Sequence, residues 1–175
     1  MLARYAVLGV IGAAAAVALA GCTDVPKQEQ PTFYQSLASP NAALDANAAA
    51  SMISGYRANN GLAALSIDPE LMRLADAQAR AMAERDRITH SPGGAAFIQR
   101  LRRSGYDAKV AAENISAGYH TLAEAFSGWR DSPPHRANML LKGADRMGIA
   151  AVYVPGSKYK VFWALIVAAP DDKRG

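Results

Sequence analysis

The sequence Trp-Arg-Asp-Ser-Pro-Pro-His-Arg at residues 129–136 joins the end of a helical pattern to two prolines and a histidine. Upstream, Thr121 and Glu124 have the spacing of a capping box, and apolar residues then repeat at helical intervals as far as Trp129. The two prolines predict the end of this helix and a fixed turn, because proline disrupts a preceding helix. We therefore expect Trp129 in the core and His135 in the turn beside it.

Two further stretches place chemically useful side chains. His90 follows an amphipathic helical pattern and precedes the loop sequence Ser-Pro-Gly-Gly. Glu113 lies in an apolar run at residues 109–116 that we interpret as a strand with two mostly apolar faces. A carboxylate there is partly buried, so it needs hydrogen-bond donors or a cation, or else becomes neutral. On the residues alone, Glu113 at a loop or at the wet end of the sheet is an equally good interpretation.

Single histidines are weak signals of function. Taken one at a time, His90 and His135 are more often structural or surface residues than ligands. The third histidine, His120, is interpreted as a loop residue. The sequence contains neither a His-Glu-x-x-His helix nor a Gly-x-Ser-x-Gly elbow, so it indicates no standard zinc-protease or serine-hydrolase motif.

The N-terminus predicts export. Residues 1–21 contain Arg4 and then an apolar stretch that is too short to span a bilayer and ends in small residues, as in a signal peptide. The sequence Leu-Ala-Gly-Cys at residues 19–22 resembles a bacterial lipobox, which implies a mature chain that begins at Cys22 and carries several acyl chains. The alternative is an ordinary signal peptide cut after Ala18 or Ala20. We expect a protein anchored in the cell envelope membrane through Cys22.

Composition limits the remaining classes. The chain has one cysteine, so packing and not an intramolecular disulfide must hold the fold. It has 19 Lys and Arg against 15 Asp and Glu, and this small, scattered excess predicts no nucleic-acid partner. The one local cluster of arginines, at 100, 102 and 103, is typical of a solvated helix face.

The mature chain is long enough for one domain plus a tether. We expect a linker at 22–40, a domain at 41–169 and a polar tail at 170–175. Apolar periodicity predicts helices at about 41–59, from Asp68 to about 84, 96–104 and 121–129, with Gln78 as the one polar residue within the stripe of the second. Strand patterns at 109–116, 148–154 and 159–168, the last two joined by a Pro-Gly turn, complete an α+β fold.

Several unlinked segments resemble the CAP superfamily, also called the SCP-like domain, in its small bacterial form. They include Asn-Asn-Gly-Leu at 59–62, the positions of His90 and Glu113, the Ser-Pro-Pro-His-Arg segment with Asn138, and Met-Gly-Ile at 147–149. The resemblance covers roughly residues 45–169. It implies a three-layer α-β-α sandwich around a small, largely antiparallel sheet.

The same resemblance implies a site. In CAP domains, residues at the positions of His90, Glu113 and His135 line a central cleft, and the two histidines can hold a divalent metal such as zinc. Many members carry a second glutamate shortly after the tryptophan matched by Trp129. Here Asp131 is near that position but out of register, which weakens the expected metal site.

Two functions therefore compete. The favoured one is a non-enzymatic envelope module whose cleft, lined by His90, Glu113 and His135, binds a lipid or a cell-wall component. The alternative is a metal-dependent hydrolase in which the histidines hold the metal and Glu113 serves as the catalytic base. Fold alone does not decide between them.

Overall fold

The computed structural model describes residues 30–171. The predicted signal peptide, Cys22 and most of the polar tail lie outside these residues. The helices are the 3-10 helix η1 (Thr32–Tyr34) and α1 (Ala46–Ala58), α2 (Pro69–Glu84), α3 (Phe97–Arg103), α4 (Leu122–Asp131) and α5 (Pro133–Met139). The strands are β1 (Ser66–Ile67), β2 (Ala108–Ala117), β3 (Arg146–Tyr153) and β4 (Val161–Pro170).

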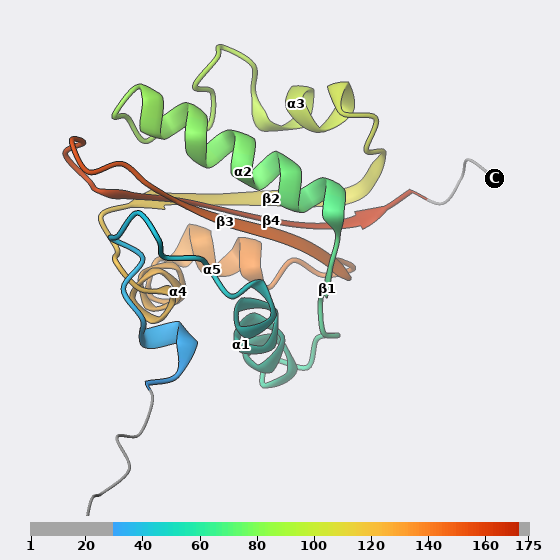
Figure 1. The fold of residues 1–175 in the computed structure, drawn as a ribbon. Coiled ribbons are helices and arrows are strands. Elements are labelled where there is room, and N and C mark those ends of the chain that lie inside the picture. Colours follow the sequence, from blue (N-terminus) through green and yellow to red (C-terminus); the bar gives the residue numbers. More distant parts are fainter. Residues whose placement is uncertain (1–29, 172–175) are drawn as a thin grey trace, which may run out of the picture.

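The four strands form one sheet in the order β1-β3-β4-β2. β4 pairs antiparallel with both β3 and β2, whereas the short β1 runs parallel to β3. Figure 1 shows α2 and α3 on one side of this sheet and α1, α4 and α5 on the other. The predicted α+β class with a small, largely antiparallel sheet is confirmed. Because β2 is an edge strand, residues from both layers can meet beside it.

Each face of the sheet carries its own apolar core. One core lies among the sheet, α1, α4 and α5, and in it the rings of Trp129 and Trp163 meet edge to face with centroids 6.3 Å apart. The other lies under α2 and α3 and includes Leu71, Met82 and Phe162. β4 is buried on both faces from Val161 to Ala169, which explains its nearly continuous apolar sequence.

Side-chain caps start α1, α2 and α4. The Asp68 carboxylate accepts hydrogen bonds from two backbone N–H groups of α2, whose first residue is Pro69. The predicted capping box of α4 is formed by Thr121 and Glu124. α1 begins at Ala46, five residues later than expected, because the Asp45 side chain caps it by accepting from the N–H of Ala48.

Two segments differ from the sequence predictions. The prolines at 133–134 stop α4, as predicted, but they also open α5, because proline is tolerated in a first helical turn. His135 is therefore a helical residue and not a turn residue. Residues 31–40, expected as linker, contain η1 and the buried Leu37, whose N–H donates to the carbonyl of His120 at 2.7 Å.

Arg57 ties α1 to the chain that follows α5. The residue is 1% exposed, and its guanidinium donates to four backbone carbonyls, those of Ala63, Met139, Leu141 and Ala144, at 2.8–3.0 Å. Burial lowers the pKa of this guanidinium. Four acceptors compensate for the lost hydration of the buried guanidinium. Arg57 therefore fastens α1 to the segment around the end of α5.

No helix within residues 30–171 combines the length and the apolar character needed to cross a bilayer.

Candidate functional site

Glu113 lies in the middle of β2 and is 4% exposed. Its Oε1 atom is 2.8 Å from Nδ1 of His90, and the Arg100 guanidinium donates to Oε1 at 3.0 Å and to Oε2 at 2.7 Å. The carboxylate is thus buried and held by donors, which excludes the interpretation that it meets water at the end of the sheet. Arg100 supplies the cation that such a group requires.

Arg100 was missed by sequence reasoning. It was interpreted as part of a solvated arginine cluster, but its side chain is 18% exposed and points from α3 to Glu113. Arg100 and Arg102 are equally adjacent to the buried Leu101, so no local signal singled out Arg100 as the inward-facing arginine. The Arg100 guanidinium also donates to the carbonyl of His90 at 3.2 Å, so it fixes both ends of the His90–Glu113 pair.

His90 forms the exposed part of this group. Its side chain is 54% exposed above the buried Glu113 carboxylate. The segment before it is fixed by Gln78, which is 1% exposed on α2 and donates to the carbonyl of Thr89 at 2.7 Å. Gln78 therefore lies inside the stripe and meets the polar segment, as its position suggested. Its Oε1 atom is buried without a hydrogen-bond partner in the described residues.

His135 approaches from the other layer. Its Nδ1 atom is 2.9 Å from Oγ of Ser132, the residue at the junction of α4 and α5. Burial lowers the pKa of His135, and the charge that His90 carries when protonated lowers it further. Both causes disfavour the charged form of the His135 imidazole.

Two asparagines fasten α5 to β2 beside the site. Asn114 donates through its amide to the carbonyl of His135 at 2.9 Å. Asn138 donates to the carbonyl of Glu113 at 3.1 Å and to Oδ1 of Asn114 at 2.9 Å. Asn138 was noted in the sequence pattern without a role. These bonds set the height of His135 along the edge of the sheet.

Other sequence candidates lie apart from this group. Asp131 pairs with its neighbour Arg130 on an exposed surface, and this guanidinium lowers the pKa of the carboxyl. The exposed His120 donates its backbone N–H to the Glu124 carboxylate. Within residues 30–171, no group of three or more His, Cys, Asp or Glu side chains is arranged to hold a metal.

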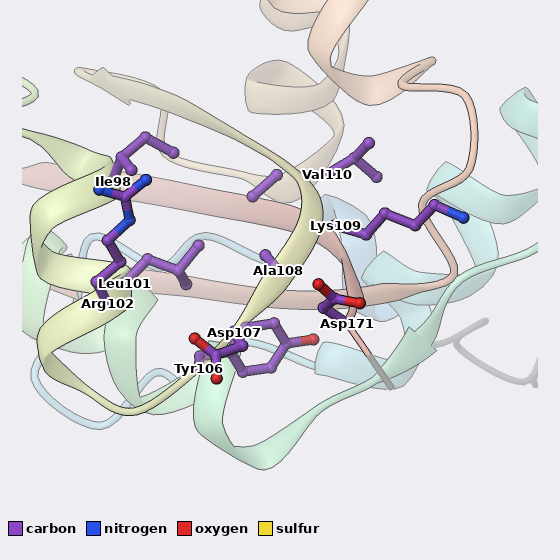
Figure 2. Close-up of a pocket in the computed structure, with 10 residues that line it drawn as sticks. Ile98, Leu101, Arg102, Tyr106, Asp107, Ala108, Lys109, Val110 and Asp171 are labelled. Carbon is purple, nitrogen blue, oxygen red and sulfur yellow. The ribbon is translucent and has the colours of Figure 1, made fainter. Parts of the chain in front are cut away.

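A separate surface pocket lies at the beginning of β2. Figure 2 shows Arg102, Tyr106, Lys109 and Asp171 around it, and its volume is about 400 Å³. Burial raises the pKa of the Tyr106 hydroxyl to about 12. None of the three predicted cleft residues lines this pocket.

The chain is similar to known proteins in sequence and in fold. It is 28% identical over 152 residues to the uncharacterised protein YkwD of Bacillus subtilis strain 168, over 74% of this chain and 59% of YkwD. The chain thus spans less than two thirds of that relative.

Solved structures share the fold. An extracellular protein with an SCP domain from Bacillus anthracis matches with a TM-score of 0.61 and 21% identity, over 70% of this chain and 39% of that one. An outer surface protein from Borrelia burgdorferi matches with a TM-score of 0.65 and 21% identity, over 73% and 93% of the two chains. The model of the cysteine-rich secretory protein family, CAP, matches residues 50–167, more than half of the sequence, and the chain therefore belongs to that family.

Proposed function

We propose that this protein is an extracellular binding module of the cell envelope, held at a membrane by lipid on Cys22. The extracellular setting is supported by the matched Bacillus anthracis protein, which is extracellular, and by the Borrelia protein, which is an outer surface protein. The anchor is supported by Leu-Ala-Gly-Cys at residues 19–22. The ligand is a lipid or a cell-wall component that contacts His90 and His135 in a cleft over Glu113.

The hydrogen bonds of the Glu113 carboxylate are the observation that favours a binding module over an enzyme. Both carboxylate oxygens already accept from Arg100, and one of them also meets His90. A general base needs a lone pair directed at the substrate proton or at a water molecule. The pairing with Arg100 and His90 instead fits a carboxylate that holds an exposed imidazole in place.

One observation favours the metal alternative. Both His90 and His135 have Nδ1 engaged, by Glu113 and by Ser132 respectively, as in metal sites where an outer partner orients each histidine. Nε2 is then the nitrogen available to an ion. A catalytic zinc, however, takes three protein ligands, and these residues supply two. A two-histidine site fits a bound ion better than it fits hydrolysis.

The ligand is identified by recovering the mature protein from its own envelope. Mass spectrometry of the purified protein will show which lipid, glycan or metal copurifies. We expect this species with the parent and with the exposed-loop control His120→Ala, and its loss from a variant that combines His90→Ala with His135→Ala. Unchanged copurification with the double variant would place the ligand elsewhere.

Turnover separates the two functions. If the recovered ligand is converted by the parent at a rate that falls in Glu113→Gln, the protein is an enzyme and the binding-module proposal is wrong. Binding that persists in Glu113→Gln, with no turnover in the parent, is the result we expect.

A further inference from the structure

The first part of the described chain is almost free of charge. Residues 30–67 contain one acidic and one basic residue, Asp45 and Arg57, although 19% of the whole chain is charged. Arg57 is buried among carbonyls. Asp45 caps α1 and accepts from the Thr32 hydroxyl at 2.9 Å. The segment therefore presents one accessible charge, the half-buried Asp45 carboxylate, and otherwise uncharged side chains.

The helix α2, on the other side of the sheet, is highly charged. α2 alone carries five charged side chains, and four of them form two ion pairs along its length: Glu70, Arg73, Asp76, Arg80 and Glu84. α2 lies across the sheet from α1 (Figure 1). The layer that contains α1 has its own exposed charges on α4 and α5, at Glu124, Arg130, Asp131 and Arg136, so the low charge is a property of residues 30–67 and not of the whole layer.

The weakly charged segment also has an apolar recess. Pro31, Phe33, Ala48 and Met52, with Thr32 and Ser51, line a hollow of about 410 Å³ between η1 and α1. Tyr34 lies next to it with 55% of its surface exposed, and its ring centroid is 4.6 Å from that of Phe33. Tyrosine suits the boundary between water and lipid, where its ring is desolvated and its hydroxyl stays wet, and phenylalanine suits the apolar side of that boundary.

The described chain begins beside this recess. Seven residues lie between Cys22 and Gln30, and the eight steps along the chain from one to the other span at most about 26–29 Å. We propose that the η1–α1 face (Pro31, Phe33, Tyr34, Ser51 and Met52) rests against the lipid bilayer and that the charged α2 layer faces the aqueous envelope. The inference rests on the proposed anchor at Cys22, because that anchor supplies the proximity.

Fluorescence quenching tests this orientation. Residues 22–175, which include every described element, are coupled through Cys22, the one thiol, to a maleimide phospholipid in phosphatidylethanolamine–phosphatidylglycerol vesicles with brominated acyl chains. Tyr34→Trp adds a reporter on the η1–α1 face. Ile98→Trp is the matched control, because Ile98 is 44% exposed on α3, in the opposite layer. Trp129 and Trp163 are at most 1% exposed and provide the same background in both variants.

We expect Tyr34→Trp to lose fluorescence on brominated vesicles relative to unbrominated ones, and Ile98→Trp to match the parent. Equal loss in both variants, or loss in neither, overturns the proposal. Absence of loss in both means that the η1–α1 face meets something other than a bilayer, such as a protein. A second pair at exposed helix positions, Ser51→Trp and Ala77→Trp, repeats the comparison if either first variant misfolds.

The coupling is chemical, so the result does not depend on lipid attachment in the cell. Failure of cellular lipidation at Cys22 would change the fractionation of the protein and leave the quenching pattern as it is. Failure of the orientation proposal would change the quenching pattern and leave the fractionation as it is.

Discussion

Arg100 changes the chemistry available at the residue scale. A buried glutamate beside a histidine, seen alone, resembles a base or a metal ligand. With the guanidinium bonded to both oxygens, the carboxylate is an acceptor already in use. Nδ1 is engaged in both His90 and His135, so the proposed ligand contacts their Nε2 atoms.

Zinc binding tests these two nitrogens. We expect calorimetric titration at pH 7.5 to show one zinc site, weakened about 10- to 100-fold in Glu113→Gln because the carboxylate orients His90. Binding should weaken further at pH 5.5, since protons compete for imidazole. His120→Ala serves as the control and should bind like the parent. If the combination of His90→Ala and His135→Ala binds zinc as tightly as the parent, the two histidines are not the site.

His135 also predicts how stability depends on pH. Its folded pKa lies below the ordinary value of 6.5, through burial and then through charge on His90. Between the folded and unfolded pKa values the unfolded chain binds more protons, so stability falls as pH drops below about 6.5. Urea midpoints from pH 7.5 to pH 5 should show this fall in the parent and a smaller one in His135→Gln. An equal slope in His135→Gln, with His120→Gln as the control, would assign the effect to another group.

At this scale the sequence predicted part of the site. Two apolar strand faces made the burial of Glu113, with its need for donors, one of two equally good interpretations, and the structure decides for burial. The contribution of Arg100 does not follow from the sequence, because an arginine cluster at helical spacing looks the same whether one member turns inward or none does. The fastening of His135 by Asn114 and Asn138 depends on how α5 meets the edge of β2, which no local pattern encodes.

At the scale of elements, helix caps and apolar stripes were correctly predicted from the sequence, whereas the helix α5 was not predicted. Asp68, Thr121 and Glu124 define helix starts by bonds within four residues, so local sequence predicts them. Two prolines give the same local signal for the end of one helix and for the start of another. Tertiary contact, here the bonds of Asn138 to β2, decides that α5 forms.

Close packing of α2 on β3 depends on Gly148. A Cβ atom added there would lie 2.1 Å from the backbone carbon of Leu71, so α2 would have to move. We expect Gly148→Ala to destabilise the fold by about 3 kcal/mol, measured by urea unfolding. Gly55→Ala is the matched control, because nothing lies within 4 Å of an added Cβ in α1. It should be neutral or stabilising by up to about 1 kcal/mol. Equal effects would contradict the packing argument.

Trp129 is the largest apolar group that α4 places in the core. It is 1% exposed and packs against Trp163. Trp129→Ala should cost about 3–5 kcal/mol, a large share of the stability of a domain this size. Tyr34→Ala, at an exposed aromatic, should change stability by less than about 0.5 kcal/mol. A urea midpoint for Trp129→Ala within error of the parent would show that the ring contributes little to the core.

At the scale of the whole molecule, the order of the layers places both the His90–Glu113 group and the η1–α1 face. The order of strands puts β2 at an edge, so the layer with α3 and the layer with α5 both reach the His90–Glu113 group. The same layering separates the uncharged η1–α1 face from the charged α2 side (Figure 1). Periodicity predicted the class, and the CAP resemblance predicted three layers. The position of the weakly charged η1 and α1 across the sheet from the charged α2 becomes visible when the elements are placed in space (Figure 1).

The proposed orientation at the membrane depends on the lipid anchor at Cys22. Cys22 follows Leu-Ala-Gly and is the one thiol in the chain, so Cys22→Ala removes the acceptor of the lipid. We expect the variant to leave the membrane fraction or to accumulate as uncut precursor, while a Cys22→Ser variant behaves in the same way because its hydroxyl does not replace the thiol. Membrane fractionation with mass spectrometry of the mature N-terminus measures both outcomes. Acyl chains retain a protein by about 0.8 kcal/mol per buried methylene, so their loss exceeds what a small uncharged face can offset. A variant that stays membrane-bound and is processed like the parent would show that another segment holds the protein there, and the bilayer would then have to be reached without Cys22.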